Sequence, residues 1–316
     1  MSMDRSVQAK VALLTIHGMG ETPRNYHSNL QDEICKRVGA LSPMLHVGSV
    51  YYQHILQANE RRVWNAVDRR PAGSRDLMRK LWWNDLRKFI LYGFGDAAGL
   101  ESRKDLPQSA YTQAQLCMAK ELFAAHRAIG SQGAVVIIAQ SLGGQVASCY
   151  FWDAQRVAQG TGVSQGIWMD IQKYAPEITN GRQLSLEEIR FLQGATFRTF
   201  ITTGCNIPIF VAAHAKLDIL PIFADKAKAG TFEWHNYFDQ DDVLGWPLSP
   251  LSPEYNKTVV DHPINAFASP WAFITKSWNP LSHTQYWGDS QVLEELEMQV
   301  CRLIEPDQKI QPAFDK

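Results

Sequence analysis

The chain has 316 residues, of which 45% are hydrophobic and 20% charged, a balance typical of a globular protein with a sizeable core. Lys and Arg number 31 and Asp and Glu 32, so no net charge draws the protein toward nucleic acid or acidic membranes, and a nucleic-acid-binding module is disfavoured. The five cysteines are scattered without C-x-x-C spacing, which argues against a disulfide framework or structural zinc and favours a reducing compartment.

The first predicted element is a short buried strand. Residues 11–16, V-A-L-L-T-I, form a continuous apolar run that stops at His17-Gly18-Met19-Gly20. This run is too short to span a membrane, and the ten residues before it lack the apolar core of a secretory signal. We therefore expect a cytoplasmic protein without an integral membrane segment.

Alternating strands and helices are predicted along most of the remaining chain. Leu30, Ile34 and Val38 recur every four residues before Gly39 and predict a helix at 27–38. Helices are also expected at 109–129 and at 142–158, and a C-terminal helix has an apolar face that includes Val292 and Leu296. Further apolar runs predict strands at 45–52, 133–139, 198–204, 231–238 and 257–262. This alternation predicts a single α/β domain with a mostly parallel sheet covered by helices on both faces.

Two segments interrupt the alternation, at 53–108 and 160–196. The first is rich in helix formers, Arg and Trp, and the second contains a capping box at Ser185–Glu188. We expect both to be helical caps above the carboxyl edge of the sheet, with Trp82 and other apolar residues of the first lining an acyl pocket. The basic, aromatic part of the first segment is either a solvated cover or a surface for peripheral membrane contact.

The stretch V-V-I-I-A-Q-S-L-G-G, residues 135–144, carries the strongest chemical signal. A buried strand ends at Gln140, Ser141 follows, and a helix of small residues begins at once. This pattern predicts a nucleophile elbow, a tight turn that lifts a serine Oγ above the sheet. Ala139 stands where the motif has its first glycine, and alanine is still small enough for that position.

These motifs resemble the α/β-hydrolase superfamily, in particular its lipase and esterase branch, over most of the chain outside the two insertions. The resemblance implies the α/β-hydrolase fold and an oxyanion hole made by the backbone N–H groups of Met19 and Leu142. It also implies a Ser–acid–His triad in that chain order, with Ser141 as the nucleophile.

Four histidines follow Ser141 and could supply the base. His283 lies in N-P-L-S-H-T-Q-Y-W-G, a loop directly before the last helix, which resembles the histidine loop of DDHD-type phospholipases and related intracellular lipases. His262, in D-H-P, is its main rival. His214 is in a helix-like stretch, and His235 is inside a predicted strand.

Three carboxylates, Asp239, Asp241 and Asp242, could supply the triad acid. Asp242-Val-Leu-Gly-Trp-Pro-Leu resembles the acid loop of the same lipases, whereas Asp241 fits the looser Asp-x-Val-Leu pattern of other hydrolases. The choice among the three stays open, although Asp242 fits best. Three clustered carboxylates could also bind a metal ion, but no EF-hand-type spacing accompanies them.

The sequence therefore predicts a serine hydrolase that cleaves a small-molecule or lipid ester through an acyl-enzyme, without a metal or organic cofactor. Thioester or amide hydrolysis by the same triad is an alternative. A catalytically silent hydrolase-fold binding protein is another.

Overall fold

The computed structural model describes residues 8–67, 77–213, 219–265 and 286–306, with only the backbone described for 77–86. His283 and His214 lie outside these residues, as do the side chains of Trp82 and Trp83.

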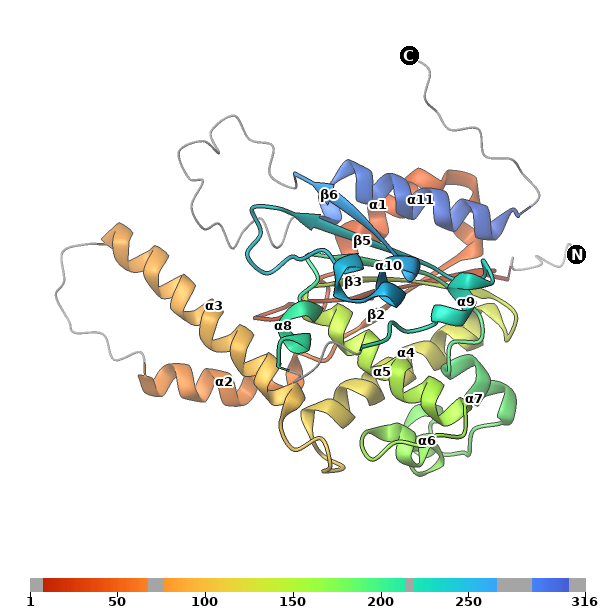
Figure 1. The fold of residues 1–316 in the computed structure, drawn as a ribbon, viewed down its shortest axis with the longest axis horizontal. Coiled ribbons are helices and arrows are strands. Elements are labelled where there is room, and N and C mark those ends of the chain that lie inside the picture. Colours follow the sequence, from red (N-terminus) through yellow and green to blue (C-terminus); the bar gives the residue numbers. More distant parts are fainter. Residues whose placement is uncertain (1–7, 68–76, 214–218, 266–285, 307–316) are drawn as a thin grey trace, which may run out of the picture.

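A six-stranded sheet forms the centre of the described molecule (Figure 1), and every neighbouring pair of strands is parallel. The strand order is β2-β1-β3-β4-β5-β6. Each strand begins and ends within two residues of its predicted position, so the predicted α/β class and parallel sheet are confirmed. The strands are β1 (Val11–Ile16), β2 (Leu45–Val50), β3 (Ala134–Gln140), β4 (Phe197–Thr203), β5 (Glu233–Asp239) and β6 (Val259–Ile264).

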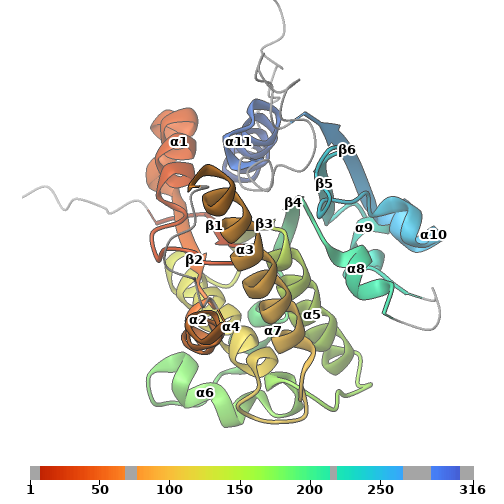
Figure 2. The same ribbon diagram turned by 90° about the vertical axis from the view of Figure 1, so that its left-hand side faces the viewer.

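Helices cover both faces of the sheet (Figure 2). One face packs against α1 (Ser28–Val38) and α11 (Ser290–Ile304), and the other packs mainly against α4 (Ala110–Ile129) and α5 (Leu142–Ala158). Successive strand side chains point to opposite faces: Leu13 belongs to the core under α1 and α11, and Leu14 to the core under α4 and α5. The smaller helices are η1 (Gly39–Met44), η2 (Ile167–Met169), α8 (Ile207–Val211), α9 (Ala224–Lys228), η3 (Ser249–Leu251), α10 (Pro253–Thr258) and η6 (Tyr286–Gly288).

The strand order contains one switch in direction, between β1 and β3. The chain passes from β1 to β2 on one side and then crosses to β3 on the other side of β1, after which it continues outward to β6. In open parallel sheets, ligands bind outside the carboxyl ends of the strands at such a switch point. The loop that begins at His17 and the turn at Ser141 follow the two strands that flank it.

The insertion at 53–108 forms α2 (His54–Val67) and α3 (Leu77–Glu101), which pack on each other. Both lie at the end of the molecule where β1 terminates (Figure 1), and α3 contacts the loop after β1 through Gly20 and Met19. Both helices therefore lie close to the loop that follows β1.

The insertion at 160–196 differs from the prediction. Its helices α6 (Ile171–Thr179) and α7 (Leu186–Leu192) pack on α4, and α7 ends just before the amino end of β4 (Figure 1). The Ser185–Glu188 capping box is present, but these helices do not cover the carboxyl edge. Their apolar residues, including Ile178 and Phe191, belong to the core on the α4 side, and this packing sets their position.

Candidate active site

Ser141 occupies a strained turn between β3 and α5. Its backbone has φ 50° and ψ −121°, a conformation that residues with a Cβ rarely adopt. A Cβ added to Gly143 would lie 2.6 Å from the His17 carbonyl oxygen, and one added to Gly18 would lie 3.0 Å from the Ser141 Cβ. The loop after β1 and the start of α5 can approach this closely only because both positions are glycine. The predicted strand, turn and helix are all present.

The Ser141 side chain is fully buried, and its Oγ has no hydrogen-bond partner among the described residues. Its backbone N–H donates to the Thr203 carbonyl at 2.9 Å, which fixes the turn to the end of β4. Leu142 is the first residue of α5, where backbone N–H groups lack an intrahelical acceptor. The hydroxyl thus lies at the positive end of a 17-residue helix.

His17 holds the loop that contains Gly18 and Met19. Its ring stacks on Tyr52 with centroids 4.1 Å apart, and its Nε2 accepts the Tyr52 N–H at 3.2 Å. The proton is therefore assigned to Nδ1, which donates to the Gly18 carbonyl at 2.7 Å. Burial lowers the pKa of His17 to about 4, so a neutral imidazole orients the loop at neutral pH.

Helix α3 holds the next part of the same loop. The Gly20 N–H donates to Asp96 Oδ2 at 2.8 Å, and the Met19 Sδ lies 2.5 Å from where a Cβ of Gly93 would be. Glu60 of α2 is buried beside Asp96, and burial together with the Asp96 charge raises the Glu60 pKa to about 8. Sequence reasoning missed this acid pair. The signal that could have pointed to it is G-F-G-D-A-A-G, residues 93–99, whose glycines allow close helix packing.

Asp242 and Asp241 have different surroundings. Asp242 is 6% exposed; its Oδ1 accepts the Leu244 N–H at 2.9 Å and its Oδ2 accepts the Tyr286 hydroxyl at 2.8 Å. Asp241 is exposed, and its backbone N–H donates to Asp239 Oδ1 at 2.9 Å. Asp239 and Asp242 are both buried, but Asp239 is the last residue of β5, whereas Asp242 lies in the loop beyond the strand.

Two further side chains hold the loop that follows Asp242. The Asn236 amide donates to the Trp246 carbonyl at 3.0 Å and to Asp261 Oδ1 at 2.7 Å. Asp261 in turn accepts the backbone N–H groups of Leu248 and Ser249 at 2.8–3.1 Å. This network joins the loop to β5 and β6. No sequence motif pointed to Asn236 or Asp261 as its anchors.

The two described candidate histidines contact each other. His235 Nδ1 lies 3.1 Å from His262 Nε2, and the His262 ring stacks on Tyr237. His235 also lies 3.4 Å from Glu233 and 3.5 Å from Glu295, a residue of α11. These contacts place both rings between the sheet and α11, and neither Ser141 nor Asp242 takes part in them. His283 lies outside the described residues.

Among 8–67, 77–213, 219–265 and 286–306, no group of three or more His, Cys, Asp and Glu side chains could hold a metal ion. Within that part of the chain no helix is long and apolar enough to cross a bilayer.

Comparison of the sequence with protein-family models finds no match, and comparison with curated proteins finds none either.

Proposed function

We propose that this chain has the α/β-hydrolase fold and is a serine hydrolase that cleaves a carboxylic ester through an acyl-enzyme. One observation carries the proposal: Ser141 has positive φ at the end of β3, and its buried Oγ lacks a hydrogen-bond partner among the described residues. Both features are costly in a serine with only a structural role. Both are expected of a hydroxyl positioned to attack a substrate.

The surroundings of Ser141 support the same chemistry. Met19 follows the Gly18 that contacts Ser141, and Leu142 begins α5. Their N–H groups are therefore our candidates to stabilise the oxyanion of a tetrahedral intermediate. The position of both at the switch point of the sheet agrees with ligand binding there.

The proposed reaction has two balanced halves. His283 accepts the hydroxyl proton as the Ser141 Oγ bonds to the ester carbonyl carbon, and then passes that proton to the departing alcohol. Water adds to the acyl-enzyme with the same proton transfers, which releases the carboxylic acid and restores Ser141. Asp242 would hold the His283 tautomer. The role of His283 rests on the sequence of its loop alone.

Labelling with a fluorophosphonate probe tests the proposal directly. The wild-type protein should be labelled on Ser141, and Ser141→Ala should abolish both labelling and hydrolysis of nitrophenyl esters. Ser148→Ala is the matched control, because its hydroxyl is also buried without a partner among the described residues and lies on the same helix. Equal labelling of the Ser141→Ala variant would exclude Ser141 as the nucleophile.

Two further outcomes separate the alternatives. A wild-type protein that is neither labelled nor active on nitrophenyl esters of any chain length would be a binding protein instead. Faster turnover of an acyl thioester than of an ester with the same acyl chain would reassign the substrate and keep the nucleophile.

A further inference from the structure

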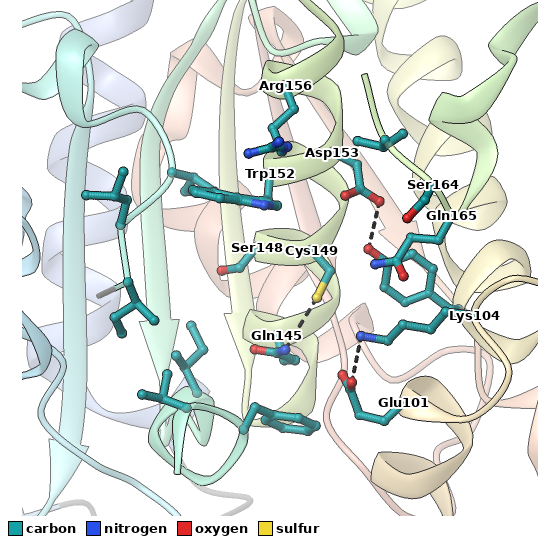
Figure 3. A pocket seen from close by; sticks show the side chains of 18 of the residues that line it. Glu101, Lys104, Gln145, Ser148, Cys149, Trp152, Asp153, Arg156, Ser164 and Gln165 are labelled. Carbon is teal, nitrogen blue, oxygen red and sulfur yellow. Dashed lines mark hydrogen bonds and ion pairs between the residues drawn. The ribbon is translucent and has the colours of Figure 1, made fainter. Parts of the chain in front are cut away.

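A pocket of about 1360 Å³ runs along the outer side of α5 (Figure 3), and neither Ser141 nor Asp242 lines it. It begins at Gln145, about one helical turn beyond Ser141, and extends to Arg156. Its two ends are eleven positions apart along α5, or about 16 Å at 1.5 Å per residue. Its size and length suit an elongated ligand better than a compact one.

One wall of the pocket is apolar. It consists of side chains from α8 and from the segment after it, opposite Trp152, which projects from α5 into the pocket (Figure 3). Leu220 in this wall is 53% exposed, so an aliphatic chain lying here would remove apolar surface from water. The wall residues are Ile207, Phe210, Val211, Ile219, Leu220 and Ile222.

The carboxylates of the opposite wall already have partners. Asp153 accepts hydrogen bonds from the Tyr111 hydroxyl at 2.7 Å and from the Gln115 amide at 2.8 Å, and Glu101 pairs with Lys104 at 2.6 Å. Burial also raises the pKa of Asp153, whereas the neighbouring Lys104 and Arg156 charges lower it. The Lys104 ammonium therefore offsets the Glu101 charge, and two neutral donors bind Asp153 Oδ2.

Arg156 differs from these residues. Its side chain makes no hydrogen bond or ion pair within the described residues, although its charge acts on Asp153 one turn earlier on α5. Its guanidinium lies at the end of the row of α5 side chains that line the pocket (Figure 3). A guanidinium bonds carboxylate or phosphate oxygens through two parallel N–H groups. The pocket thus combines an aliphatic wall with a cation at one end.

We propose that this pocket binds a long-chain aliphatic anion. Its chain lies between Trp152 and the wall formed by α8 and residues 219–222, and its carboxylate or phosphate head binds Arg156. Binding is non-covalent and needs no group from the candidate active site. The inference goes beyond the proposed ester hydrolysis and stands whether or not Ser141 is a nucleophile.

Calorimetric titration of the full-length Ser141→Ala protein tests this, since the variant removes any hydrolysis at Ser141. Dodecanoate and dodecyl phosphate, both below their micellar concentrations, should bind saturably, and butyrate should bind at least tenfold more weakly. The relative affinities of the two dodecyl ligands show which head Arg156 prefers. Dodecyl maltoside has the same chain length with a neutral head.

Added substitutions separate head from chain. Arg156→Gln should weaken dodecanoate about tenfold and leave dodecyl maltoside unchanged. Arg190→Gln, which removes an exposed cation on α7, is the charge-matched control and should change neither ligand. Leu220→Asp should weaken both ligands, and because Leu220 is half exposed the variant should keep the melting temperature of its parent.

Three results would overturn the proposal. They are the absence of saturable binding, dodecanoate affinity no greater than that of butyrate, and equal losses in Arg156→Gln and Arg190→Gln. Failure of Ser141 labelling in the earlier experiment would leave the present result unaffected.

Discussion

The Tyr286 hydroxyl donates to Asp242 Oδ2 at 2.8 Å and accepts the Asp239 backbone N–H at 2.9 Å. Tyr286 lies 44 residues beyond Asp242, in the short helix η6 just before α11. Its hydroxyl joins the end of β5 to the carboxylate of the next loop. Asp242 therefore cannot rotate freely, and a carboxylate held in this way is suited to orient an imidazole.

Tyr286→Phe should lower kcat for nitrophenyl esters about tenfold with little change in KM. The variant keeps the buried ring and removes two hydrogen bonds, the one accepted from the Asp239 N–H and the one donated to the Asp242 carboxylate, of which the latter contributes about 1.5–3 kcal/mol. Tyr174→Phe on α6 is the control and should match the wild type. A Tyr286→Phe enzyme with unchanged kcat would mean that this bond supports the fold alone.

Asp242→Asn should reduce kcat by roughly 10⁴, as a wrong-tautomer substitution does in other triads. Asp241→Asn should be much milder, because the Asp241 side chain is exposed. Steady-state kinetics of the two variants decide the assignment. The reverse ranking would move the acid role to Asp241. Equal losses would show that the difference in burial between the two carboxylates does not decide which of them is the triad acid.

The elements that the sequence predicted well are those fixed by local patterns. The β3–Ser141–α5 unit has a β-branched run, a polar break and a small-residue helix in consecutive positions, so neighbouring residues alone determine it. Asp242 was preferred over Asp241 from the register of its loop alone; in the structure Asp242 is buried and Asp241 is exposed.

Contacts between distant segments could not be predicted in the same way. Asp96 and Gly20 are 76 residues apart, and their bond exists because α3 packs on the loop after β1. The 160–196 insertion was assigned to the wrong edge because its position depends on packing against α4, which its capping box does not reveal. The pocket along α5 likewise arises from several segments that are far apart in the sequence.

His17 should make the protein less stable in acid. Its folded pKa of about 4 is below its ordinary value of 6.5, so the unfolded chain binds more protons between these values. The contribution of neutral His17 to the free energy of unfolding is therefore complete above pH 6.5 and is lost as pH falls through about 4, an effect of about 3 kcal/mol. The asparagine of a His17→Asn variant does not titrate in this pH range. Urea unfolding from pH 4 to 7 should show a shallower pH dependence for this variant than for the wild type, and parallel curves would exclude His17 as the source.

Glu60 should have the opposite effect at alkaline pH. Burial and the neighbouring Asp96 raise its pKa to about 8 from 4.5, so the folded state binds more protons than the unfolded state between these values. Its contribution to the free energy of unfolding is therefore full below pH 4.5 and is lost as pH rises through about 8.

Glu60→Gln keeps the shape of the side chain without the charge, so the melting temperature of this variant should fall less than that of the wild type between pH 6 and 9. Glu187→Gln, an exposed site on α7, should follow the wild type. If Glu60→Gln also follows the wild type, then Glu60 ionises without cost, and the contact of α2 and α3 with the Gly20 loop does not depend on its proton.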